Sequence, residues 1–254
     1  MKRSIAALTL AFLSGTTLLT AQPAPLDAHE NSLEVFRQRL GVFIHWTPPG
    51  KDQGNGVTYA DGVAWKTLDE FCDRVDVPKV CADIAELGFE YVILTDFHGN
   101  ATLLHPSWAS DNYRGEGYAA KRDLMGEMIA ELKKYDIGMI PFTHPIVGHN
   151  FPMPQQEKTG WLDPRNSYGR WNNFVNHAYL DITSRYRDDM MCMGFDSTFG
   201  YAGDLFMGKL DTLRLQKTIR DAAPALPLMA LAGPNEVCEL GLREVWKPGH
   251  HPSM

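Results

Sequence analysis

Histidine and aspartate residues lie at the ends of four short apolar runs in this sequence. His45 ends the first run, Asp96 and His98 follow the second, His144 follows the third and Asp196 ends the fourth. Imidazole and carboxylate groups transfer protons, attack as nucleophiles, orient polar ligands and coordinate divalent metal ions. The same residue types also serve as hydrogen-bonded structural residues or helix caps. Their chemistry therefore depends on whether the fold brings them together.

The apolar runs predict five β-strands. Each run is apolar almost throughout instead of alternating with polar residues, which is typical of strands that are covered on both faces of a parallel sheet. The runs are GVFIHW (41–46), YVILTD (91–96), IGMIPF (137–142), MMCMGFD (190–196) and PLMALA (227–232).

Apolar residues at helical spacing fill the segments between these strands. They predict helices around residues 77–84, 124–132, 175–186 and 210–219. Strands alternating with helices indicate an α/β fold with a parallel sheet. Two long connections, 47–68 and 143–169, each follow a strand and precede a helix. That order places them at the carboxyl edge of the sheet, where such folds bind ligands.

The first 21 residues have the features of a secretory signal peptide. Two cations precede an apolar stretch that contains small residues and no acid. We therefore expect residues 1–21 to be removed and the protein to be secreted or periplasmic. Loss of Lys2 and Arg3 changes the formal net charge from −7 to −9. This charge argues against nucleic acid or an anionic membrane as a partner.

Four cysteines are too few for a disulfide framework in a chain of 254 residues. Cys72 and Cys81 are near enough in sequence to form a local pair. Cys192 lies within the fourth apolar run, where a buried thiol behaves as a small apolar side chain.

Several segments of the chain resemble one family in their order and motifs. They are LGVFIHW (40–46), VDVPKVCADIAELGFEYVILTDFHGNATLLHPS (75–107), RDLMGEMIAELKKYDIGM (122–139), SRY (184–186) and MGFDS (193–197). They resemble the α-L-fucosidase-like retaining glycoside hydrolases, whose catalytic domain is a TIM barrel. The resemblance covers about residues 39–200.

This resemblance implies a fold, an activity and residue roles. The fold would be a (β/α)8 TIM barrel, and the activity would be hydrolysis of terminal fucose or a related sugar from a glycan. His45 and His98 would contact sugar hydroxyls, Trp46 would wall the pocket and Asp196 would be the nucleophile. The expected partner is a carbohydrate, without a cofactor or a metal.

Only five strand and helix units are visible before residue 232, whereas a TIM barrel has eight. We therefore expect residues 30–254 to form a catalytic domain of this type that is incomplete at its C-terminus. An open barrel would expose strand edges, and self-association is expected of such edges.

The chain differs from the family pattern at three places. HGNAT (98–102) replaces two adjacent histidines followed by Asp-Gly-Phe, Ile140-Pro141-Phe142 replaces a tyrosine, and ALAGPNE (230–236) lacks an arginine. These differences leave the sugar open and favour one alternative, a non-catalytic carbohydrate-binding barrel. A second alternative is a metal-dependent barrel hydrolase with His45, His98, His144 and Asp196 as ligands. The absence of HxH and HExxH motifs argues for the sugar.

A retaining mechanism needs a second carboxyl group, an acid/base, roughly 5 to 5.5 Å from the nucleophile. In the resembled family it follows the fifth strand, where Glu236 and Glu239 lie. We take Glu236 as the candidate. His144 and Trp65 join the substrate-binding candidates, because an imidazole can hydrogen-bond a hydroxyl and an indole can stack on a sugar face.

Overall fold

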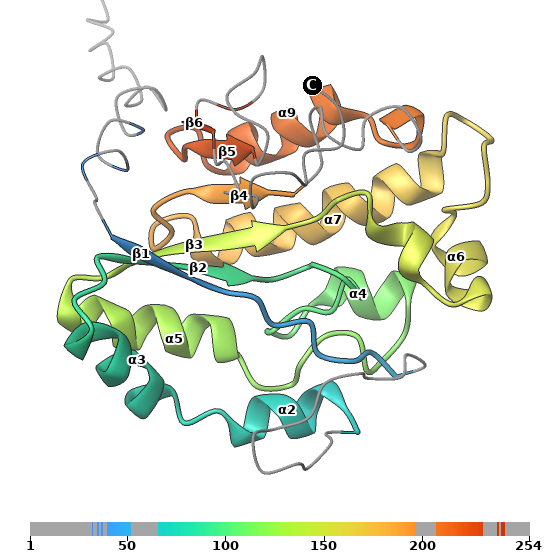
Figure 1. Cartoon of the computed structure of the whole chain (residues 1–254). Helices are drawn as coiled ribbons and strands as arrows, with labels where there is room; N and C mark the ends of the chain where they lie inside the picture. The colour runs from blue at the N-terminus through green and yellow to red at the C-terminus, as the bar shows by residue number, and fades with distance from the viewer. Residues whose placement is uncertain are drawn as a thin grey trace, which may run out of the picture.

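The strands form one parallel sheet. The structure is a computed structural model that describes residues 32, 35, 37, 40–51, 66–196, 207–230, 238 and 240–241. Within these residues the sheet has six strands in the order β1-β2-β3-β4-β5-β6, and each strand pairs in parallel with the next (Figure 1). The strands are β1 (Gly41–Ile44), β2 (Tyr91–Thr95), β3 (Gly138–Thr143), β4 (Met193–Phe195), β5 (Leu228–Ala230) and β6 (Leu240–Gly241).

The predicted α/β class with a parallel sheet is confirmed. Each of the five predicted runs contains a strand, although β4 and β5 have only three residues each. β6 is an addition, because a two-residue strand gives no periodic signal in the sequence.

Helices connect the strands, as the apolar spacing predicts. Those that match predicted helices are α3 (Val77–Glu86), α5 (Leu124–Leu132), α7 (Gly169–Tyr186) and α9 (Thr212–Ala222). Three helices of six or seven residues were not predicted: α2 (Leu68–Arg74), α4 (Trp108–Tyr113) and α6 (Met153–Thr159). Short 3-10 turns occur at η1 (Lys133–Tyr135), η2 (Val147–Asn150) and η3 (Met207–Lys209). No helix in the described ranges is both long and apolar enough to cross a membrane.

Side-chain caps explain where many of these helices begin. Asp76, Asp123 and Asp211 each accept a hydrogen bond from a backbone N–H in the first turn, of α3, α5 and α9 respectively. In α6, Pro154 occupies the first turn, and the helix ends at Gly160, whose φ of 81° is left-handed. The proline and the glycine therefore define a helix within the connection 143–169, which has no helical periodicity in the sequence.

The sheet separates a large apolar core from a small one. Successive residues of a strand point to opposite faces. Val92 and Leu94 of β2 belong to the large core, together with the buried faces of α3, α5 and α7, which lie along one side of the strands (Figure 1). Ile93 lies in the small core with Ile140 and Phe142 of β3. The strands are apolar throughout because their alternate residues contribute to the two cores on the two faces of the sheet.

All four cysteines are free and buried, so the pairing of Cys72 with Cys81 that the spacing allowed is wrong. Each thiol instead packs as a small apolar group within the core. Burial raises the pKa of Cys72 to about 12 and that of Cys81 to about 11, which keeps both thiols protonated.

A fully buried ion pair closes the loop after β2. The Asp96 carboxylate accepts a hydrogen bond from the Leu104 N–H through Oδ1 at 2.8 Å, and its Oδ2 lies 3.2 Å from His105 Nε2. Both side chains are inaccessible to solvent. Burial alone would lower the pKa of His105, but the Asp96 carboxylate and the Pro106 carbonyl raise that pKa on balance. The pair therefore ties the two ends of this loop together.

Replacement of Asp96 by asparagine should destabilise the fold in a pH-dependent way. Removing one partner of a buried pair typically costs about 3 to 5 kcal/mol. Because the pKa of His105 is raised in the folded state above its ordinary 6.5, the pair contributes fully below pH 6.5 and loses its contribution as pH rises through the raised value. Urea unfolding of wild type and Asp96→Asn should show a difference in stability that shrinks toward alkaline pH.

Asp83→Asn is the matched control, because Asp83 pairs with Lys79 at 2.7 Å on the exposed surface of α3. It should leave stability nearly unchanged at every pH. An Asp96→Asn loss no larger than this control, or one that grows with pH, would contradict the assignment.

Candidate active site at the carboxyl edge of the sheet

The structure brings the histidines and the aspartate of the strand ends to one edge of the sheet. His45 follows β1 directly, His98 lies in the loop after β2, His144 follows β3 and Asp196 follows β4. Because the strands are parallel, their carboxyl ends share one edge. Four residues that span 151 positions of the chain are therefore neighbours.

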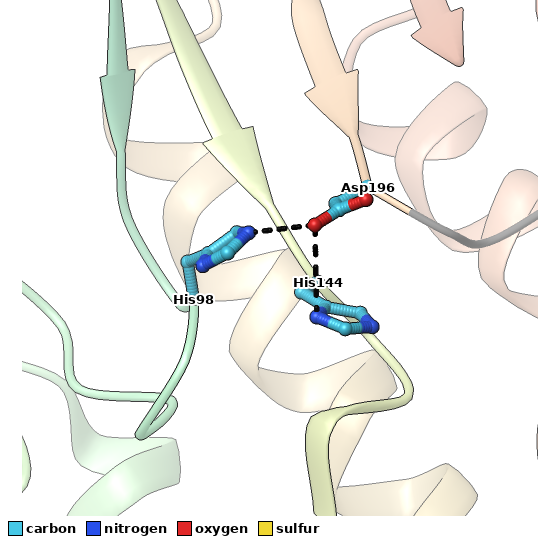
Figure 2. A group of neighbouring side chains, drawn as sticks. All are labelled: His98, His144 and Asp196. Atoms are coloured by element: carbon cyan, nitrogen blue, oxygen red, sulfur yellow. Dashed lines mark hydrogen bonds and ion pairs between the residues drawn. The ribbon is translucent and has the colours of Figure 1, made fainter. Parts of the chain in front are cut away.

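Asp196 is at the centre of this group (Figure 2). Its Oδ2 lies 2.9 Å from His98 Nε2, a hydrogen bond, and 4.0 Å from His144 Nδ1. The His98 ring is 4.7 Å from the His45 ring and 5.4 Å from the His144 ring, measured between centroids. The Asp196 side chain keeps 20% of its surface exposed, so solvent reaches it.

Backbone hydrogen bonds beyond the strands fix these positions. The His144 N–H donates to the Phe97 carbonyl at 3.0 Å, and the Asp196 N–H donates to the Thr143 carbonyl at 2.7 Å. Phe97 has a left-handed φ of 50° and is fully buried, with its ring against Phe174 and Tyr179 of α7. His98 thus extends from a loop whose preceding residue is held in the core.

A buried hydroxyl pair supports the end of β3 beneath the site. The Tyr179 hydroxyl donates to Thr143 Oγ1 at 2.7 Å, and Thr143 Oγ1 donates to the Gly194 carbonyl at 2.9 Å. Burial raises the pKa of Tyr179 well above its usual range, so the hydroxyl stays a donor. The apolar spacing over 175–186 predicts the helix that carries Tyr179 but not this hydrogen bond, because the bond joins residues 36 positions apart.

Phe142 forms the floor below His98. The two rings are stacked, with centroids 5.7 Å apart and an angle of 25° between their planes. Gly194 of β4 makes room for the Phe142 ring, since a Cβ at that position would lie 2.8 Å from Phe142 Cδ2. Alternation along β3 places Phe142 on the same face as Ile140, which is the signal that could have identified it.

Partial or full removal from water lowers the pKa of two of the imidazoles. It lowers the pKa of His144 to about 4, although the nearby Asp196 carboxylate opposes the shift. It also lowers the pKa of His45, and neighbouring His98 adds to that effect. At neutral pH His144 is a neutral imidazole, which offers one donor and one acceptor to a polar ligand.

Four of the residues singled out in the sequence lie elsewhere or outside the described ranges. The Trp46 ring packs edge-on against Phe71 of α2 at 5.4 Å, within the large core, so its described contacts are not with the histidines. Trp65 and Glu236 lie outside the described residues. Asp96, expected to converge on the same rim, instead points into the core toward His105.

The same cluster also has the composition of a metal site. His98, His144 and Asp196 each offer one donor atom, and these three atoms lie within 4.8 Å of one another. The residue types suit either a polyhydroxylated ligand or a cation.

Replacement of Asp196 by asparagine should lower the pKa of His144 below its wild-type value of about 4, because the carboxylate is the charge that raises it. Two-dimensional NMR of the imidazole nitrogens as a function of pH measures this pKa. The control is Asp188→Asn, which removes a carboxylate whose side chain is 87% exposed. An unchanged or raised pKa in Asp196→Asn would show that the carboxylate does not face His144.

Comparison with known proteins gives structural likeness alone. No protein-family model and no curated protein matches the chain. A crystal structure of an α-L-fucosidase GH29 from Bacteroides thetaiotaomicron matches with a TM-score of 0.52 at 17% identity, over 83% of this chain and 49% of that chain. α-L-fucosidase AlfC from Lactobacillus casei, in complex with α-L-fucose product, matches with a TM-score of 0.53 at 15% identity, over 79% of this chain and 70% of that chain.

A further match is a trapped covalent intermediate of an α-L-fucosidase GH29 from Bacteroides thetaiotaomicron in complex with 2-fluoro-fucosyl fluoride. It has a TM-score of 0.52 at 18% identity and covers 83% of this chain and 50% of that chain. The chain thus spans about half the length of the Bacteroides structures that it matches. Its parallel α/β sheet is structurally similar to part of the TIM-barrel catalytic domain of GH29 α-L-fucosidases.

Proposed function

We propose that this protein is an exported glycoside hydrolase that removes terminal fucose or a related sugar from a glycan with retention of configuration. Asp196 is its nucleophile, and His45, His98 and His144 bind the sugar. The observation that carries the proposal is the Asp196 carboxylate, which is accessible at the carboxyl edge of the sheet and hydrogen-bonded to His98 at 2.9 Å.

The position of Asp196 suits nucleophilic attack. Its backbone is fixed by the hydrogen bond to Thr143, and the bond to His98 Nε2 sets the direction of the carboxylate. A nucleophile held in one orientation needs little reorganisation when the substrate arrives. The residue also follows β4 in the segment MGFDS, on which the resemblance to the fucosidases placed the nucleophile.

The reaction has two steps. First an Asp196 oxygen bonds to the anomeric carbon while the bond to the leaving-group oxygen breaks and a second carboxyl group protonates that oxygen. Water then attacks the same carbon, the acid/base takes its proton, and Asp196 is released. The trapped covalent intermediate in the similarly folded Bacteroides α-L-fucosidase supports this route.

Among the described carboxylates, Asp96 is excluded as the acid/base because it is fully buried against His105. Glu236 stays our candidate from the sequence, outside the described residues.

The imidazoles suit recognition of sugar hydroxyls. The neutral His144 ring can donate to one hydroxyl and accept from another, because its pKa of about 4 keeps it uncharged at neutral pH. His45 is exposed and lies edge-on to His98, with ring centroids 4.7 Å apart. Phe142 closes the floor beneath His98 with an apolar surface.

Exposure to a 2-fluoro-fucosyl fluoride should leave a covalent sugar on Asp196, which peptide mass spectrometry would locate. Asp196→Asn should form no adduct and lose roughly 10³-fold or more in kcat/KM, because the attacking oxygen is removed. Asp188→Asn, an exposed acid eight residues earlier, should label and turn over as wild type does.

An adduct on another residue, or turnover retained in Asp196→Asn, would overturn the assignment of the nucleophile. Sugar binding by folded wild type without any adduct would support the alternative of a non-catalytic carbohydrate-binding barrel. Circular dichroism of each variant establishes that the fold is intact.

A further inference from the structure

The donor set around Asp196, which the proposed function uses for the sugar, also has the composition of a metal site. His98 Nε2, His144 Nδ1 and Asp196 Oδ2 lie within 4.8 Å of one another, from three separate strand ends (Figure 2). The carboxylate oxygen is 2.9 Å from the first nitrogen and 4.0 Å from the second. Each side chain is partly accessible, with 9%, 13% and 20% of its surface exposed for His98, His144 and Asp196 respectively.

These donor-to-donor distances are close to those of a zinc site. Zn²⁺ bonds to imidazole nitrogen and carboxylate oxygen at about 2.0 to 2.2 Å, so neighbouring donors in a tetrahedral site are roughly 3.3 to 3.6 Å apart. The measured 2.9 and 4.0 Å bracket that range. The third pair, His98 Nε2 and His144 Nδ1, lies within 4.8 Å, so metal binding would draw the two nitrogens together by side-chain rotation.

The charge and chemistry of the donors select the ion. One carboxylate and two imidazoles suit Zn²⁺ and its neighbours Co²⁺ and Fe²⁺, whereas Ca²⁺ and Mg²⁺ prefer oxygen ligands throughout. Water would complete a four-coordinate shell around these three donors.

Backbone hydrogen bonds prepare the site. The His144 N–H to Phe97 carbonyl bond and the Asp196 N–H to Thr143 carbonyl bond join the three strand ends directly. A metal would therefore meet ligands that are already close, and binding would not need to order a loop between them.

We propose that His98, His144 and Asp196 bind one divalent transition-metal ion, for which Zn²⁺ is the best fit. A consequence that rests on the proposed function is inhibition. A Zn²⁺ ion bound to Asp196 Oδ2 occupies the carboxylate that attacks the sugar, so the metal and the glycosyl group exclude each other.

Titration of metal-free protein with Co²⁺ alone, followed by visible absorption, and with Zn²⁺ alone, followed by calorimetry, tests the site. We expect one ion per chain and the visible bands of a four-coordinate Co²⁺ site. Asp196→Asn, His98→Ala and His144→Gln should each weaken binding by more than about 100-fold, since even loss of an outer-shell partner costs 10- to 100-fold.

Two controls separate this site from other histidines. His177→Ala removes a histidine of α7 whose ring contacts Trp108 and Tyr113, and His250→Ala combined with His251→Ala removes two adjacent histidines near the C-terminus. Both should bind as wild type does. Loss of binding in either control, or binding that survives in Asp196→Asn and His144→Gln, would overturn the proposal.

X-ray absorption of the wild-type Zn²⁺ complex gives a readout that does not depend on any variant folding. It should show two imidazole ligands, and a spectrum with oxygen donors alone would also overturn the site.

The two proposals fail separately, because metal binding is measured without sugar and trapping is measured in EDTA. An adduct in EDTA that disappears with added Zn²⁺ supports both. Zn²⁺ binding without any adduct in EDTA overturns the glycosidase and leaves the metal site. An adduct in EDTA from a protein that binds no Zn²⁺ overturns the metal site and leaves the glycosidase.

Discussion

The site depends on a backbone ladder that continues past the ends of the strands. The Phe97 carbonyl accepts from the His144 N–H, and the Thr143 carbonyl accepts from the Asp196 N–H. These two bonds set the spacing between neighbouring chains just where the functional side chains begin. All strands of a parallel sheet end on one edge. The two backbone bonds hold these ends close enough for Asp196 Oδ2 to lie 2.9 Å from His98 Nε2 and 4.0 Å from His144 Nδ1.

Much of the fold could be predicted because it follows from local patterns. The five apolar runs contain β1 to β5, and helical spacing located α3, α5, α7 and α9. Helices of six or seven residues, such as α2 and α4, show too few turns for a periodic signal, and β6 has only two residues. Sequence spacing does not show that Cys72 and Cys81 stay unpaired, because this depends on how each thiol packs in the core of the folded protein.

The candidate site was predictable to the extent that strand ends converge. That rule brought together His45, His98, His144 and Asp196, but it does not say where a particular side chain points. Asp96 follows β2 and points into the core, where its carboxylate accepts a hydrogen bond from the Leu104 N–H and pairs with His105. The spacing of residues in the sequence does not predict these contacts. Trp46 follows His45 and packs with Phe71 on the opposite face, as alternation along an extended chain requires.

Phe97 connects the carboxyl edge of the sheet to helix α7, which lies behind it. Its left-handed backbone is held by the aromatic rings of Phe174 and Tyr179, and its carbonyl is the acceptor for the His144 N–H. The spacing of the histidines therefore depends on how α7 fills the space behind them. Substitutions of Phe174 or Tyr179 would change the distances between the site residues through Phe97, without altering any residue of the site itself.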